Sequence, residues 1–70
     1  MESKNLIEGL QEEIVRVKEM IKEYQSLPKN AGMIASKFME ADVNAAETSI
    51  ITMDTVQMIR ALKLLREYVN

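Results

Sequence analysis

The stretch KNLIEGLQEEIVRVKEMIKEYQS, residues 4–26, decides the fold of this chain. Its apolar side chains recur at alternating intervals of three and four residues. They are Ile7, Leu10, Ile14, Val17, Ile21 and Tyr24. This spacing is the a/d pattern of a coiled-coil helix and places all six side chains on one face. The stretch therefore predicts a long helix over about residues 4–26, with Ser3 as its N-cap.

These six side chains form a seam that needs a partner helix. In a parallel pair of two copies, Glu13 of one chain would face Lys18 of the other, which is the charge pairing expected beside such a seam. The seam spans fewer than three heptads, so packing against helices of the same chain is the alternative. We expect the seam, together with Leu64 and Tyr68, to form contacts between subunits.

A first break in the helical pattern falls at Pro28 and Gly32, because the residue before a proline avoids the helical conformation. A second helix is predicted over about residues 33–50, with Asn30 as its cap. Apolar and small side chains of this helix share one stripe. The stripe contains Ile34, Phe38, Ala41, Ala45 and Ser49.

A second break is predicted near residues 51–54, although this segment contains neither glycine nor proline. Asp54 followed by Gln57 resembles a capping box, and Thr52 is the competing cap. A third helix then runs over about residues 55–69. Whether the second and third helices are separate, or are one bent helix, stays open at this point.

The third helix is apolar on almost every side. Its apolar residues are Val56, Met58, Ile59, Ala61, Leu62, Leu64, Leu65, Tyr68 and Val69. A helix with this distribution is typically buried on several sides. One small bundle covers only part of each helix, so we expect subunit contacts. The prediction is a single all-α domain over residues 1–70, a helical hairpin or three-helix bundle with a coiled-coil first helix, assembled as a homo-oligomer.

The composition supports assembly. A core built from 70 residues rarely supplies more than roughly 3–5 kcal/mol. The chain has no cysteine and no histidine, so disulfides and a structural zinc site are not expected to stabilise it. Apolar residues nevertheless make up 47% of the sequence. Regular helix packing and oligomerisation are the remaining sources of stability.

The same composition argues against an enzyme. Histidine, the commonest general acid and base at neutral pH, is absent, and so is a cysteine nucleophile. We expect no cofactor and no metal. No run of 18 apolar residues and no secretory signal occur, so we expect no membrane partner and a cytoplasmic location, the host cytoplasm if the chain is phage-encoded. The net charge of −2 gives no general attraction to nucleic acid.

Cationic side chains are the candidate contacts for an anionic ligand. Arg60, Lys63 and Arg66 step three residues apart, so they rotate around the helix by about 60° per step instead of stacking. Lys29 and Lys37 complete the candidate set. The simpler interpretation is that these cations solvate an exposed strip and complement the C-terminal helix dipole.

Residues 40–43 (EADV), 46–47 (AE) and 54–67 (DTVQMIRALKLLRE) resemble a family of small helical proteins found in phages and prophages. Met53 stands where the family pattern has glycine. Small oligomeric phage proteins of this kind often act by binding, either to a host defence protein or to a nucleotide signal held between subunits.

This resemblance suggests stoichiometric capture of a host-defence factor or of a small anionic ligand such as a cyclic nucleotide. If a nucleotide is captured, the five cations are the expected contacts. A structural or adaptor oligomer with no small ligand is the alternative. DNA binding is a third and weaker hypothesis, because no helix has a dense basic face.

Overall fold

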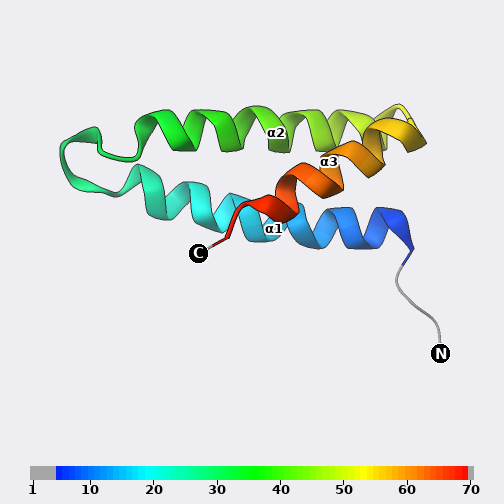
Figure 1. Cartoon of the computed structure of the whole chain (residues 1–70), viewed down its shortest axis with the longest axis horizontal. Coiled ribbons are helices and arrows are strands. Elements are labelled where there is room, and N and C mark those ends of the chain that lie inside the picture. The colour runs from blue at the N-terminus through cyan, green and yellow to red at the C-terminus, as the bar shows by residue number, and fades with distance from the viewer. Residues whose placement is uncertain (1–4, 70) are drawn as a thin grey trace.

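The structure, a computed structural model, describes residues 5–69. It contains α1 (Leu6–Gln25), the single 3₁₀ turn η1 (Pro28–Asn30), α2 (Met33–Ile51) and α3 (Thr55–Glu67). Helices α1 and α2 lie side by side and antiparallel, and α3 folds back across both of them (Figure 1). The described residues contain no strand, which confirms the all-α class, and the three helices form a bundle.

One apolar core holds the three helices together. Its buried side chains are Leu10, Ile14, Val17, Met20 and Ile21 of α1, Met39, Val43 and Ala46 of α2, and Met58, Ala61 and Leu65 of α3. Helix α1 contributes more of these side chains than either other helix, because its apolar residues share one face. The opposite face of α1 is polar and stays in solvent.

Helix α1 begins with a capping box. The Oδ1 atom of Asn5 accepts a hydrogen bond from the backbone N–H of Glu8 at 2.8 Å, and the Glu8 carboxylate accepts one from the Asn5 N–H at 3.4 Å. This arrangement satisfies two N–H groups at the start of the helix. The predicted cap, Ser3, lies outside the described residues, and Asn5 is the N-cap of α1.

The connection between α1 and α2 differs from the prediction. Lys29 and Asn30 both adopt left-handed backbone conformations, with φ of 59° and 60°. Gly32, and not Asn30, is the N-cap of α2, and it provides no side-chain hydrogen bond. Gly32 packs directly against the backbone of Tyr24 at the end of α1. This close approach of two backbones, which only glycine permits, sets the start of α2.

Helices α2 and α3 are separate, and the turn between them is a Schellman motif. The N–H of Met53 donates to the Ile50 carbonyl, and the N–H of Asp54 donates to the Ser49 carbonyl, at 3.1 and 3.0 Å. Asp54 then caps α3 by accepting the Gln57 N–H at 3.1 Å. Met53 occupies the left-handed position of the motif, with φ of 55°.

Helix α2 buries a different face from the predicted stripe. Of the stripe, only Ser49 is buried, while Ile34 and Phe38 are strongly exposed. The buried residues of α2 are Ser36, Met39, Val43, Ala46 and Ser49. The two buried serine hydroxyls donate to backbone carbonyls one turn earlier, so their burial leaves no polar group unpaired. Both faces of α2 are apolar enough to pack, and contacts with α1 and α3 select between them.

Helix α3 ends at Glu67, two residues before the predicted end, because Tyr68 has an extended backbone. Arg16 of α1 holds this end of the helix in place. Its guanidinium donates to the Leu65 carbonyl at 2.8 Å and to the Glu13 carboxylate at 2.9 Å. A cation beside the last carbonyls complements the helix dipole.

Candidate binding surfaces

The seam of α1 lies inside the chain's own core. Leu10, Ile14, Val17 and Ile21 are buried against α2 and α3, and Ile7 and Tyr24 are partly buried against the same core.. In this fold the four buried side chains are not accessible to a second copy, so the subunit contact predicted for them is corrected to internal packing. The physical reason is that α2 and α3 of the same chain already cover the seam.

The charged residues predicted to pair between copies also have partners within the chain. Glu13 contacts Arg16 at 2.9 Å, and the Nζ atom of Lys18 contacts the Glu47 carboxylate at 2.8 Å. The second of these pairs bridges α1 and α2. The charged residues on both sides of the seam therefore form ion pairs within the chain.

Leu64 and Tyr68, the other two predicted contact residues, differ in their environments. Leu64 is exposed on α3 and is available to a partner. Tyr68 packs partly against the core, and its hydroxyl donates to the Asp42 carboxylate of α2 at 2.6 Å. Tyr68 thus ties the end of α3 to the middle of α2.

Burial raises the pKa of Tyr68 to about 12, and the hydrogen bond to Asp42 and the negative charges of Asp42 and Glu67 act in the same direction. The ordinary pKa of a tyrosine is about 10. Because the pKa is higher in the folded chain, the protonated hydroxyl stabilises the fold below pH 10. This contribution is lost as the pH rises through about 12.

We expect Tyr68→Phe to lower the free energy of unfolding by about 1 kcal/mol at pH 7, because one hydrogen bond is lost. The variant should also lose less stability than the wild type between pH 10 and 12. Urea unfolding over this pH range measures both effects. The matched control is Tyr24→Phe, since the Tyr24 hydroxyl bonds to no residue that the structure describes. Equal pH profiles for wild type and Tyr68→Phe would contradict the assignment.

The five candidate cations are not gathered at one place. Lys29 lies in η1 and Lys37 lies on α2, whereas the other three cations are on α3. All five are exposed, and none has an ion-pair partner among residues 5–69. The fold therefore does not assemble a five-cation site within one chain.

Two of the cations share a shallow depression on α3. Lys63 and Arg66 line it together with Glu67, and its volume is about 430 Å³. Ile59 and Leu62 provide apolar lining. Two cations beside an apolar surface can contact an anionic ligand, but Glu67 opposes a second negative charge. This depression is the part of the predicted ligand site that the structure brings together.

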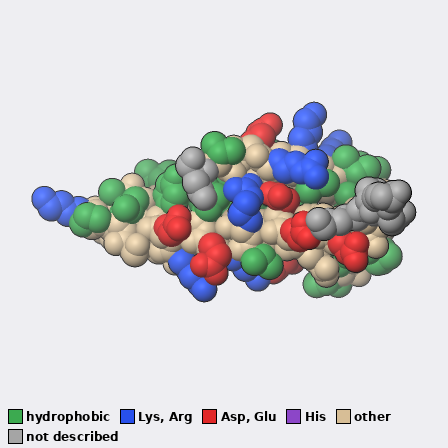
Figure 2. Space-filling view, turned by 90° about the horizontal axis from the view of Figure 1, so that it is seen from below, with side chains coloured by type: hydrophobic (Ala, Val, Ile, Leu, Met, Phe, Trp, Pro, Cys, Tyr) green, Lys and Arg blue, Asp and Glu red, His purple; other side chains and the backbone are tan. Residues whose placement is uncertain are grey.

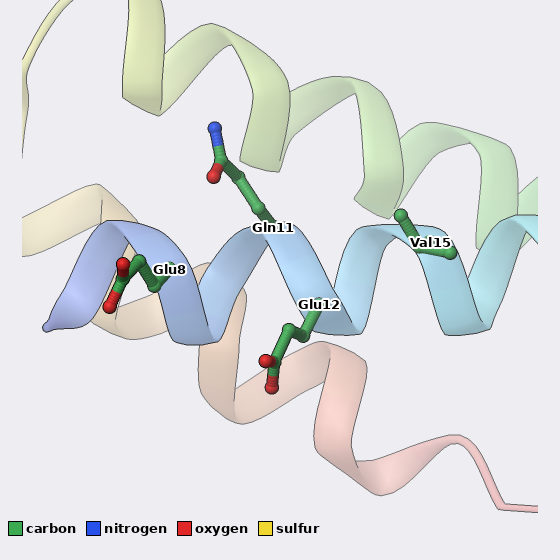
Figure 3. A pocket seen from close by; sticks show the side chains of 4 residues that line it. All are labelled: Glu8, Gln11, Glu12 and Val15. Carbon is green, nitrogen blue, oxygen red and sulfur yellow. The ribbon is translucent and has the colours of Figure 1, made fainter. Parts of the chain in front are cut away.

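Further shallow depressions lie along α1. One of about 330 Å³ is lined by Glu8, Gln11, Glu12 and Val15, with its two glutamates on a different side of the helix from Gln11 and Val15 (Figure 3). A second, of about 410 Å³, lies between α1 and α2 and shares Gln11 and Val15 with the first. Within residues 5–69, no three acidic side chains converge into a group that could hold a metal ion.

The outer face of α2 carries an apolar surface that we call the α2 strip. Its six residues follow one another at alternating intervals of four and three, and all are exposed. They are Ile34, Phe38, Ala41, Ala45, Thr48 and Thr52. None is charged. Helix α2 forms one long edge of the molecule (Figure 1).

A second apolar surface, which we call the turn cluster, lies at the Schellman turn and beside it. It consists of Ile51, Met53, Val56 and Ile59, each more than half exposed. Seen from the α1 side, hydrophobic side chains are visible at this end of the molecule as well as elsewhere on the same face (Figure 2). Neither this cluster nor the orientation of the α2 strip was evident from the sequence. The glycine expected at Met53 was the one local signal of an unusual turn.

The chain matches no protein-family model, no curated protein and no solved structure. In the described part of the chain, no helix combines the length and apolar character that crossing a membrane requires. The exposed surfaces described above are therefore the remaining indication of function.

Proposed function

We propose that this chain is a non-enzymatic binding protein that captures a protein partner at fixed stoichiometry through the turn cluster. Met53 is the observation that supports the proposal. It is 66% exposed and has a φ of 55°, in a position that glycine occupies at much lower cost. A non-glycine residue held in this conformation costs roughly 1–2 kcal/mol. Backbone strain at an exposed residue is common at binding sites.

The chemistry of the turn cluster suits a protein surface better than a small anion. Methionine is flexible and polarisable, so it adapts to irregular apolar partners. Ile51, Val56 and Ile59, its neighbours in the sequence, add exposed branched apolar side chains. Exposed apolar groups at one end of a small domain are typical of protein-binding sites. A host-defence protein is the class of partner that the resemblance to phage proteins suggests.

The decisive variant is Met53→Gly. We expect it to raise the free energy of unfolding by about 1 kcal/mol, because glycine relieves the left-handed strain. We also expect it to reduce partner capture at least tenfold, because the central apolar contact is lost. Urea unfolding measures the first effect. Pull-down from a bacterial lysate, with mass spectrometry of proteins retained at constant ratio to the bait, measures the second.

A matched control for capture is Leu27→Ala, which removes an exposed apolar side chain just before η1, at the other end of the bundle from the turn. It should leave capture unchanged. Undiminished capture by Met53→Gly would refute the role of the turn cluster. Because that variant is expected to be more stable than the wild type, reduced capture could not be attributed to unfolding.

Capture of a small anionic ligand is the second candidate, and the pairing of Lys63 with Arg66 at one depression favours it. Thermal-shift measurements with a panel of cyclic nucleotides separate the two candidates. Protein capture predicts no stabilisation by any of them, whereas stabilisation that Arg66→Ala abolishes would favour the ligand. A structural subunit, the remaining alternative, would retain only further copies of itself.

A further inference from the structure

The α2 strip has the spacing of a coiled-coil seam, yet the chain's own helices leave it uncovered. Its residues alternate at intervals of four and three, as a and d positions do. Phe38 is 65% exposed and Ile34 is 74% exposed. Helices α1 and α3 are packed on the other apolar face of α2, so the strip stays exposed among the residues that the structure describes.

The order of side-chain sizes along the strip restricts how it can pair. Its bulky residues, Ile34 and Phe38, lie in the first half of α2, and the residues in its second half are smaller. In a parallel pair each residue would face its own copy. Isoleucine and phenylalanine would meet their own copies in the first half, and the smaller alanines and threonines would meet their own copies further along, so the two helices could not keep a constant separation.

An antiparallel pair avoids this mismatch. Each layer then joins one a position to one d position of the other copy. The facing residues are Ile34 with Thr52, Phe38 with Thr48, and Ala41 with Ala45. The bulky residues meet small ones in the outer layers, and the central alanines allow close approach of the backbones. The strip is therefore complementary to itself in one orientation.

We propose that the α2 strip binds the same strip of a second copy of this chain, in an antiparallel pair whose twofold axis passes between Ala41 and Ala45. The contact is isologous, so it closes at two chains and does not propagate into a fibre. It is independent of partner capture, because the turn cluster is made of other residues. Met53→Gly should leave the pair intact.

The strip is about 27 Å long, because its first and last residues are 18 positions apart on one helical stretch. A surface of this length and one helix wide is smaller than the ~800 Å² that each partner buries in a typical specific interface, so we expect the pair to be weak.

Charges flank the strip without opposing the pair strongly. Asp42 lies on the side of α2 that faces α3, near the proposed axis, and its carboxylate accepts the Tyr68 hydroxyl at 2.6 Å. The same residue of the second copy would be nearby. Because these charges have the same sign, added salt should strengthen the pair by screening them. An association driven by the α3 cations would weaken instead.

Light scattering on the full chain, at a concentration on the order of 100 µM, tests the stoichiometry. We expect about 16 kDa, twice the 8.0 kDa of one chain, and no dissociation in concentrated NaCl. Phe38→Asp should weaken the pair at least tenfold. The matched control is Val15→Asp, at a residue of similar exposure (62%) on α1, and it should have no effect. Circular dichroism checks that both variants stay helical.

Cross-linking tests the orientation, since the chain has no cysteine of its own. In the antiparallel pair, identical positions at the ends of the strip lie about 27 Å apart. Ile34→Cys mixed with Thr52→Cys should therefore cross-link through a short bismaleimide, and neither variant should do so alone. Cross-linking of each variant with itself would indicate a parallel pair and overturn the proposal. A monomeric wild type, with the strip left for a different protein, would also overturn it.

Discussion

Leu65→Ala is expected to remove most of the chain's stability at 25 °C. Leu65 has no exposed surface, and it lies where α3 crosses α1 and α2. Truncating a buried leucine to alanine costs about 2–5 kcal/mol, because the cavity that it leaves relaxes only in part. A domain of this size has roughly 3–5 kcal/mol of stability to lose. Urea unfolding followed by circular dichroism gives the change in free energy directly.

The neighbouring residue provides a matched control. Leu64 is also on α3, but its side chain is exposed, so Leu64→Ala should change the free energy of unfolding by no more than about 0.5 kcal/mol. The two variants have the same composition and differ by one position on the helix. Similar losses from both would mean that α3 does not pack with the face described here.

The contrast between α1 and α2 explains which parts of the fold the sequence predicts. In α1, one face is apolar and the other is charged, so local periodicity identifies the buried face correctly. In α2, the residues at 34, 38, 41 and 45 and those at 36, 39, 43 and 46 both follow helical spacing. Local pattern cannot choose between these two faces, because packing against α1 and α3 makes the choice.

The helix caps show the same difference between what the local sequence predicts and what packing between helices decides. Asp54 was predicted as a cap from its own short-range pattern, and the hydrogen bond from Gln57 confirms it. Asn30 failed as a cap because α2 starts where Gly32 meets the Tyr24 backbone, a contact between two different helices. A contact between two different helices leaves little trace in the local sequence.

The candidate site illustrates a further limit. Spacing along α3 indicated that its cations do not stack, and the structure brings only Lys63 and Arg66 to one depression. The distances from α3 to Lys29 and Lys37 depend on the whole fold and could not be deduced. The exposure of Met53 likewise depends on the two turn hydrogen bonds, which the residue types alone do not specify.

Gly32→Ala is expected to lower the free energy of unfolding by about 1–3 kcal/mol, the range for overpacking a tight contact. A Cβ atom at this position would fall on the Tyr24 carbonyl oxygen, and it would lie 2.9 Å from the carbonyl carbon and 3.0 Å from the Cα atom. All three are backbone atoms near the end of α1, so no side-chain rotation can relieve the clash. Its φ of −102° is accessible to any residue, which makes the effect purely steric.

The same substitution at Gly9 should have the opposite sign. Gly9 lies inside α1, and a Cβ atom there would meet nothing within 4 Å. Alanine should therefore raise the free energy of unfolding by about 1 kcal/mol, because it is the better helix former. Urea unfolding of the two single variants and of the double variant measures the change in the free energy of unfolding at each glycine. Gly32→Ala as stable as the wild type would contradict the close packing of α2 against the end of α1. A gain at Gly9 beside a loss at Gly32 would show that contact between helices, and not helix propensity, determines the cost at Gly32.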